Sequence, residues 1–453
     1  MKRLKVLSLA IAIMFAVSSL AACGNTQSKI ETATTEQKQQ ETTQPPAEKT
    51  AENKTTKLTF ISGKPEIQAQ IEEMLKVFSQ ENPGIEMEYV AGQAGQSPYQ
   101  SLTVMYNAGN AASVYMMEQA DVLKLKDKVA DLSAERFSKD AIGSALTPVM
   151  ADGKLLAAPF ITESVGLIYN KKIIEKAIGG SFDPNTIKTT NDLETLFKKV
   201  EATGVTPIGI SPEDWSLGAH LMMYMYANQF PNSEENKEFT NRLRSGTADL
   251  INNKVYNGWV DTFDMIKKYN INKKDPLAAN NDKNAAFITQ GETAFWFMGT
   301  FIWPVMGALK ANPSDFGLMP VPVSNNSADE GNTKLLSLFS MYLCVDKEQN
   351  SPEQQAASKK FIDWLLYSQS GQDHFINKML LVPAYTHITL EAKDPLSVSL
   401  AKYIKANQTL DFNILYPSDH WKVLGGSLQK YLGGQSDRAG LTKEIETYWK
   451  NAK

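Results

Sequence analysis

Basic clusters, paired histidines and catalytic motifs are scarce in this chain of 453 residues. Its formal net charge is −4, and no run of lysine and arginine is dense enough to follow a phosphate backbone, so nucleic acid is a poor candidate partner. The histidines are scattered, and none forms the i, i+4 pair of a helical zinc site; they are His220, His374, His387 and His420. A nucleophile elbow and a phosphate-binding glycine loop are missing too. These absences argue against catalysis, and we expect neither a cofactor nor a metal site.

The hydrophobic stretch at the start of the chain, from Val6 to Val17, is too short to be a comfortable transmembrane span. It follows three cations in the first five residues and precedes small residues, an order typical of a secretory signal peptide. Loss of these three cations with the peptide would change the formal net charge from −4 to −7.

Cysteine is also scarce, with only Cys23 and Cys344 in the chain. Cys344 lies in the apolar run LFSMYLCVD, where we expect a buried, small hydrophobic side chain. The sequence Leu-Ala-Ala-Cys that ends at Cys23 resembles the lipobox of bacterial lipoproteins. The resemblance implies cleavage after residue 22, acylation of the Cys23 thiol with a diacylglyceryl group, and therefore no disulfide. The alternative is an ordinary secreted protein that is cut nearby and keeps a spare thiol.

The segment that follows Cys23 is polar, with Ile30 as the one large apolar residue between Gly24 and Thr56. Such a segment cannot bury enough surface to offset its ordering entropy. We therefore expect residues 1–22 to be a lipoprotein signal peptide, and residues 23–56 to be the lipidated cysteine and a disordered tether.

The remaining residues, about four hundred, are enough for two domains and alternate between predicted strands and helices. A strand is expected over 57–62, and the helix after it places five apolar residues on one face: Ile67, Ile71, Met74, Leu75 and Phe78. Further strands are expected at 85–90, 113–117, 206–210, 292–299 and 316–323, and a long buried strand at 335–346. The final hundred residues are mainly helical. No single boundary separates two domains, which indicates lobes built from interleaved segments.

Four stretches in a fixed order resemble the extracellular solute-binding proteins of ABC importers, family 1, the group that includes maltose-binding protein. They are DGKLLAAPFITESVGLIYNKKIIEKAIG, GETAFWFMGTFIWP, FGLMPVPV and WLLYSQSGQDHFINKMLLVPA, and the resemblance covers nearly all of 57–453. It implies an α/β, two-lobed periplasmic-binding-protein-like fold (type II) with a hinge and an interlobe ligand cleft. Ligand contacts from both lobes would stabilise the closed state, which then signals to the permease.

The family pattern places the N-terminal lobe at 57–162 and 339–388, and the C-terminal lobe at 163–338 and 389–453. It implies a carbohydrate ligand, ABC permease transmembrane subunits as partners, membrane attachment through the lipid, and a monomer. Residues 163–166 would lie on the first crossing between the lobes.

The same resemblance implies candidate ligand-binding residues, namely Lys64, Glu118, Glu163, Glu213, Asp214, Trp215, Phe301 and Trp421. Glu163 matches a position where the family has an acidic residue that binds the sugar. Phe301 and Trp421 match positions where the family has tryptophans that stack on sugar rings. Met117 stands where the relative has an aromatic residue, so a sandwich of three rings is not expected. These residue types suit a sugar, because pyranose faces lie on aromatic rings and hydroxyl groups need paired donors and acceptors.

Four alternatives stay open. The tryptophans Trp215, Trp296, Trp303 and Trp421 could be core residues, and Glu163 could cap a helix or brace the hinge. Glu163 and Glu213 could be the acid pair of a lipoprotein glycosidase. The same fold could also bind a polyamine, a phosphate ester or a peptide, although the matched positions offer rings and carboxylates and no arginine cluster.

Overall fold

The computed structural model describes residues 55–92, 97–142, 145–230, 233–411, 416–417 and 419–452. These belong to a compact unit, Asn53–Lys453. The expected signal peptide, Cys23 and the tether up to residue 54 lie outside the described residues. Every helix in the described ranges is too short or too polar to cross a bilayer.

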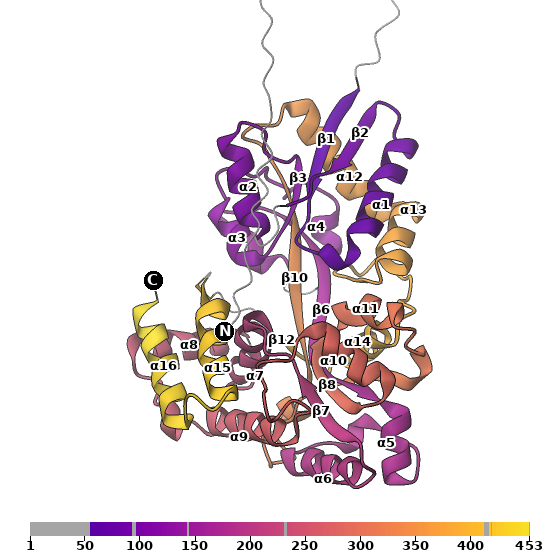
Figure 1. Cartoon of the computed structure of the whole chain (residues 1–453). Helices are drawn as coiled ribbons and strands as arrows, with labels where there is room; N and C mark the ends of the chain where they lie inside the picture. The colour runs from indigo at the N-terminus through magenta and orange to yellow at the C-terminus, as the bar shows by residue number, and fades with distance from the viewer. Residues whose placement is uncertain are drawn as a thin grey trace, which may run out of the picture. The chain divides into compact units, whose positions relative to one another are not determined.

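The first lobe begins with parallel strands and the helices that connect them (Figure 1). Its elements in this part of the chain are β1 (Thr56–Ile61), η1 (Pro65–Ile67), α1 (Gln68–Glu81), β2 (Ile85–Tyr89), α2 (Pro98–Asn107), β3 (Val114–Met117), α3 (Gln119–Lys124), α4 (Phe137–Asp140), η2 (Thr147–Val149), β4 (Met150–Ala151) and β5 (Lys154–Leu155). The five apolar residues predicted to share a helical face are all buried, which confirms that prediction.

Two long strands join this lobe to the second one. They are β6 (Ala158–Asn170) and β10 (Leu335–Val345), and they pair with each other antiparallel. The main path of the sheet runs β2-β1-β3-β10-β6-β8-β7, so a single hydrogen-bonded sheet continues from one lobe into the other. Figure 1 shows both strands extending between the lobes.

In the second lobe, helices surround the C-terminal end of β6 and the N-terminal end of β10. Its elements up to β10 are α5 (Lys171–Ile178), η3 (Pro184–Thr186), α6 (Thr190–Glu201), β7 (Thr206–Ile210), the π-helix η4 (Ser216–Leu221), α7 (Met222–Ala227), α8 (Ser233–Ser245), η5 (Leu250–Asn252), α9 (Lys254–Tyr269), α10 (Asn281–Gln290), β8 (Thr293–Gly299), η6 (Thr300–Ile302), α11 (Trp303–Ala308), η7 (Pro313–Asp315), β9 (Phe316–Met319) and η8 (Glu330–Thr333).

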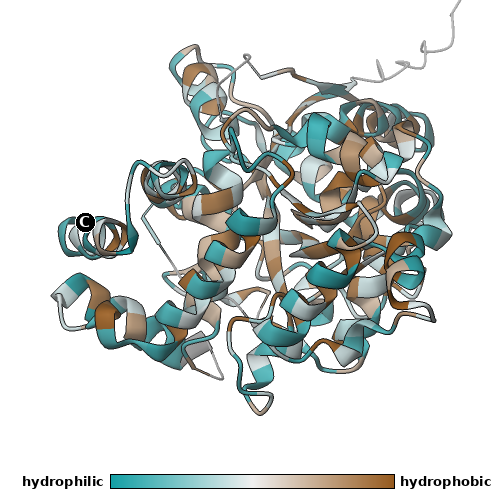
Figure 2. Ribbon diagram, turned by 60° about the horizontal axis from the view of Figure 1, so that its bottom comes forward, coloured by the Kyte–Doolittle hydropathy of each residue, from teal (hydrophilic) through white to brown (hydrophobic). Residues whose placement is uncertain are grey.

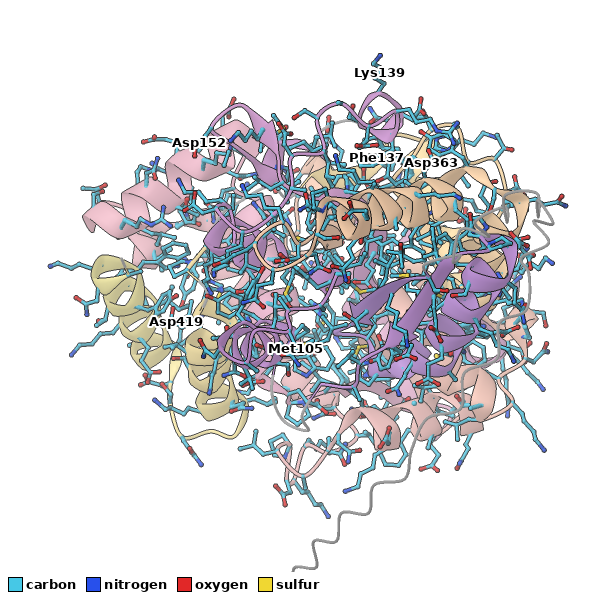
Figure 3. All side chains as sticks on the ribbon, turned by 90° about the horizontal axis from the view of Figure 1, so that it is seen from above. Met105, Phe137, Lys139, Asp152, Asp363 and Asp419 are labelled. Atoms are coloured by element: carbon cyan, nitrogen blue, oxygen red, sulfur yellow. The ribbon has the colours of Figure 1, made fainter. Side chains whose placement is uncertain are left out.

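After β10 the chain returns to the first lobe and then crosses again to the second. The elements are α12 (Pro352–Tyr367), α13 (Gln369–Asp373), η9 (His374–Lys378), β11 (Val382–Pro383), α14 (Pro395–Lys405), β12 (Thr409–Asp411), α15 (His420–Leu432) and α16 (Arg438–Asn451). In the first lobe, Arg136 beside α4 forms a two-point ion pair with Asp363 of α12, at 2.5 and 2.7 Å. Figure 3 labels Asp363 and the neighbouring Phe137.

The buried apolar side chains form separate cores on the two sides of the crossing. One core draws on residues 58–161 and 341–388, and two others draw on residues between 165 and 449. Figure 2 shows that the helices around the strands carry both hydrophobic and hydrophilic residues, as helices that cover a core must. Cys344 is fully buried in the first core, as expected, and its burial raises the pKa of the thiol.

The prediction that β10 is buried along its whole length is wrong, because residues 337–340 are only half-buried. At this point the strand leaves one core for the other: Leu338 packs against the second-lobe core and Phe339 against the first-lobe core. The pairing with β6 is also irregular here. Phe339 pairs with Thr162 and Met341 with Ile161, so Ser340 is the extra residue of a β-bulge.

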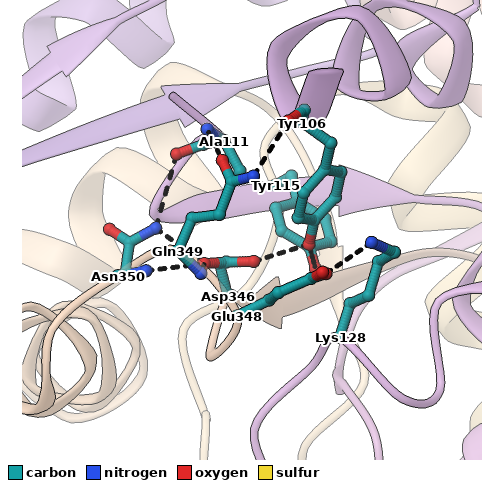
Figure 4. A network of polar contacts seen from close by, with 8 residues as sticks. All are labelled: Tyr106, Ala111, Tyr115, Lys128, Asp346, Glu348, Gln349 and Asn350. Atoms are coloured by element: carbon teal, nitrogen blue, oxygen red, sulfur yellow. Dashed lines mark hydrogen bonds and ion pairs between the residues drawn. The ribbon is translucent and has the colours of Figure 1, made fainter. Parts of the chain in front are cut away.

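A buried polar network fixes the chain where β10 ends (Figure 4). Asp346 is fully buried and accepts hydrogen bonds from Tyr106 Oη at 2.5 Å and from the backbone amides of Gln349 and Asn350 at 2.8 and 2.9 Å. Lys128 pairs with Glu348 and lies 4.2 Å from the centre of the Tyr106 ring. A buried carboxylate with several donors is satisfied, so the network anchors β10 to the first lobe.

Candidate functional site

A cavity of about 630 Å³ lies where the two lobes meet. The first lobe contributes the loop after β1 and the start of α3, and the second contributes η4, α10, η6 and α15. Both crossing strands reach it, through Glu163 of β6 and residues 338–341 of β10. Of the eight ligand-binding residues predicted from the sequence, the structure brings six together here: Lys64, Glu118, Glu163, Trp215, Phe301 and Trp421.

An ion pair between the first lobe and a crossing strand lies at the centre of the cavity wall. Lys64 Nζ is 2.5 Å from Glu163 Oε1 and 3.7 Å from Glu66 Oε1. The relative exposures of Lys64 and Glu163 are 8% and 5%. Burial alone would lower the pKa of Lys64, but the carboxylates of Glu163 and Glu66 outweigh it and raise that pKa. Lys64 is therefore protonated and forms a buried ion pair with Glu163.

The loop that carries Lys64 is held by a local hydrogen bond. The Ser62 hydroxyl accepts from the Lys64 backbone amide at 3.0 Å. Ser62 is itself buried, as is Met117 at the end of β3. Met117 does not line the cavity, whereas Gly63 does.

Aromatic rings of the second lobe form another wall. The Trp215 and Phe301 rings are 6.1 Å apart, and the His220 ring lies 5.3 Å from Trp215 and 5.5 Å from Phe301. Lys64 Nζ lies 5.0 Å from the centre of the Phe301 ring, close enough for a cation–π contact between the lobes. Burial lowers the pKa of His220 to about 4, so its imidazole is neutral at physiological pH.

Trp421 is partly exposed and lies in the first turn of α15. Asp419 occupies the N-cap position of this helix, but its carboxylate accepts a hydrogen bond from Tyr448 Oη at 2.8 Å and none from the helix backbone.

Two glycines let the backbone of α15 pack directly against the backbone of η4 and the residue before it. A Cβ added at Gly218 would lie 2.1 Å from the Trp421 carbonyl oxygen, and one added at Gly425 would lie 2.3 Å from the Asp214 carbonyl oxygen. Because Trp215 and His220 lie on or next to η4, this contact sets their position relative to Trp421.

Glu213 and Asp214 do not line the cavity. Glu213 Oε1 accepts from the Asn281 backbone amide at 3.0 Å, and Asp214 Oδ1 accepts from the Trp215 amide at 2.8 Å. Burial raises the pKa of Glu213. Both carboxylates thus hold their own loop and the start of α10, a local role that a match of sequence positions could not distinguish from ligand binding.

Two of the tryptophans considered are core residues. Trp296 is fully buried and donates from Nε1 to Ser211 Oγ at 3.0 Å, while Trp303 is 6% exposed and packs against Phe316. Several lining residues were not predicted, namely Glu66, His220, Met223, Asn281, Asp282, Ser340 and Tyr416. None of them stands in a sequence motif that marks a site.

The fold and this cavity define a two-domain binding protein whose cavity opens between the domains. A family model for bacterial extracellular solute-binding proteins matches residues 73–406. The chain belongs to this family, which comprises extracellular proteins that bind solutes.

Individual relatives are distant. An uncharacterized ABC transporter extracellular-binding protein of Pyrococcus horikoshii is 23% identical over 268 residues, which span 55% of this chain and 56% of the relative. The match thus covers little more than half the length of that relative.

Solved structures show the same fold over nearly their whole length. A family 1 extracellular solute-binding protein from Bifidobacterium longum subsp. infantis is 20% identical, with a TM-score of 0.64, 87% coverage of this chain and 99% of its own. Raffinose-bound RafE, a protein of Streptococcus pneumoniae, is 18% identical, with a TM-score of 0.69 and coverages of 87% and 99%. Maltose-bound MalE3 of T. maritima is 19% identical, with a TM-score of 0.67 and the same coverages.

Proposed function

We propose that this protein is a lipid-anchored, non-catalytic receptor that binds a carbohydrate, an oligosaccharide, between its lobes and delivers it to the permease of an ABC importer. The observation that carries the proposal is the cavity between the lobes, in which the rings of Trp215, Phe301 and Trp421 face the same space as Glu163 and Lys64.

The chemistry of the cavity suits a sugar. The rings offer surfaces on which the C–H faces of a pyranose can stack. Carboxylates accept hydrogen bonds from sugar hydroxyl groups, and the Lys64 ammonium donates them. A cavity of about 630 Å³ is within the range usual for small-molecule sites and has room for a short oligosaccharide.

The arrangement of the lobes supports binding by closure. The boundaries that we propose, 57–162 with 339–388 and 163–338 with 389–453, are supported by the division of the buried apolar residues among separate cores. Because both lobes and both crossing strands contribute to the cavity wall, a ligand that contacts all of them favours the closed state.

The partners and the anchor extend this proposal. The similarity to raffinose-bound RafE and maltose-bound MalE3 supports a sugar ligand, and the similarity to the ABC transporter protein of Pyrococcus horikoshii supports permease subunits as partners. The lipobox-like residues before Cys23 support membrane attachment, since a diacylglyceryl group supplies the two chains that durable anchoring needs. We further propose that the receptor is a monomer.

A titration tests the function directly. The purified protein is screened by thermal shift and calorimetry against maltose, raffinose and N-acetylated chitin oligosaccharides, with spermidine and a hexose phosphate as ligands of other classes. We expect a sugar to raise the melting temperature by mass action and to reduce the radius of gyration in small-angle scattering. Binding of only the polyamine or the phosphate would refute the sugar assignment.

The same incubation separates a receptor from a glycosidase. The bound oligosaccharide should be recovered intact by chromatography after prolonged incubation. Release of shorter products would favour the enzyme, although Glu213 lies off the cavity that would have to hold its substrate.

A further inference from the structure

Three buried polar atoms of residues that line the cavity have no hydrogen-bond partner among the described residues. They come from three different elements, η4, α10 and β10, and are His220 Nδ1, Asn281 Oδ1 and Ser340 Oγ. A buried polar atom without a partner costs about 1 to 3 kcal/mol, so native proteins retain few of them. Among the described residues eighteen such atoms occur, and these three are the ones whose residues line the cavity, where a ligand can supply the missing partner.

Ser340 holds a special position among the three. It is the unpaired residue of the β-bulge in β10, between Phe339 and Met341, each of which has a partner in β6. Bulges turn a side chain away from the direction that regular alternation would give it, and they are frequent beside functional sites. Between Leu338 and Phe339, the strand β10 passes from the core of the second lobe to the core of the first, and the bulge at Ser340 follows directly.

We infer that Ser340 is a ligand-contacting residue presented by this bulge, and that with the His220 imidazole it recognises an uncharged, hydroxyl-bearing ring ligand. This inference rests on the proposed sugar-binding function and adds to it the residue and the ligand group. A serine hydroxyl and a neutral imidazole can each donate and accept one hydrogen bond, as a sugar hydroxyl can. Neither group adds charge to a cavity that Lys64, Glu66, Glu118, Glu163 and Asp282 also line.

The position of Ser340 links ligand contact to the hinge. The ligand would contact the crossing strand itself at one of the two irregularities in its pairing with β6, in addition to the walls of the two lobes. Binding at Ser340 would therefore restrain the bulge in one conformation and contribute to closure.

The test compares two serines of the same strand. Ser340→Ala removes the proposed contact, and Ser337→Ala is the matched control, since Ser337 is half-buried, pairs regularly with Ser164 and does not line the cavity. The probe is whichever of maltose, raffinose or the chitin oligosaccharides binds the wild-type protein. We expect Ser340→Ala to weaken binding about two- to tenfold, the usual effect of one lost hydrogen bond. We expect Ser337→Ala to bind as the wild type does.

The melting temperature without ligand distinguishes a ligand contact from a structural role. Because Ser340 Oγ has no partner within the described chain, Ser340→Ala should melt at the wild-type temperature or slightly above it. His220→Phe keeps a ring beside Trp215 and Phe301 and should also weaken binding.

Each contrary result has its own meaning. Equal affinity of Ser340→Ala and wild type overturns the inference and leaves the sugar receptor intact. A fall of several degrees in the ligand-free melt of Ser340→Ala also overturns it, because the hydroxyl would then have a structural partner. If the wild-type protein binds none of the sugars, the proposed function fails, and this inference fails with it.

Discussion

Replacing Gly425 by alanine should disturb the contact between α15 and η4. The added Cβ would lie 2.3 Å from the carbonyl oxygen of Asp214 and 2.7 Å from two further backbone atoms of that residue. Backbone atoms cannot turn aside as a flexible side chain can, so the two helices must separate. Overpacking of this kind costs roughly 1 to 3 kcal/mol.

Gly426, the next residue, provides a matched control. A Cβ at Gly426 would meet no heavy atom within 4 Å, and both positions lie in the interior of α15. Alanine is favoured over glycine in a helix by about 1 kcal/mol, so Gly426→Ala should stabilise the protein by up to that amount. Gly425→Ala gains the same helix propensity, so the two variants should differ by the overpacking cost alone, roughly 1 to 3 kcal/mol, with Gly425→Ala the less stable.

Scanning calorimetry of the two variants and the wild type measures this order. The affinity for the bound sugar should fall with Gly425→Ala, because separation of the helices moves Trp421 away from Trp215. Equal melting temperatures for the two variants would refute the close backbone contact. A destabilised Gly425→Ala variant with unchanged affinity would keep the contact and refute its role in arranging the aromatic wall.

Three further predictions concern single side chains. Trp421→Ala should weaken sugar binding by about one to two decades, from roughly 1 to 3 kcal/mol of lost stacking, with little change in the melt; a collapsed melt with binding retained would identify a structural tryptophan. Burial lowers the pKa of His420 to about 3, so below about pH 6.5 the unfolded chain takes up a proton that the native protein does not, and stability falls as the pH decreases. His420→Gln should remove this loss. In urea titrations, the free energy of unfolding of the wild type should therefore fall relative to that of the variant by about 1.4 kcal/mol per pH unit between pH 6 and 4. A difference between the two proteins that does not change with pH would contradict this prediction. Cys23→Ala should release or mislocalise the protein without unfolding it, and a variant that remains on membranes after a high-salt wash would contradict the lipid anchor.

Local sequence pattern was sufficient where an element is defined by its own residues. The apolar spacing of α1 depends only on the helical period, and the strands β1, β2, β3, β7 and β8 lie within a residue or two of their predicted bounds.

The candidate site was harder to predict because its geometry depends on pairing between distant segments. The family resemblance pointed to Lys64 and Glu163, but the ion pair joins residues 99 positions apart and no sequence period encodes it. Ser340 was missed because a bulge is a property of two paired strands, and the strand β10 alone looks regular. Glu213 was predicted because its loop matches a ligand-binding loop of the family. Its side chain is instead held by a hydrogen bond from the start of α10.

The continuity of β6 and β10 through both lobes constrains how the protein can be made. The first core needs side chains from residues 58–161 and from residues 341–388, so no early part of the chain contains a complete lobe. A chain emerging from the ribosome or from the export channel can therefore build helices such as α1 but cannot finish a core until β10 has followed. For the same reason, a shortened protein that keeps only the first lobe would have to join the first part of β6 directly to the second half of β10. The strands that connect the lobes thus also determine the order in which the protein can fold.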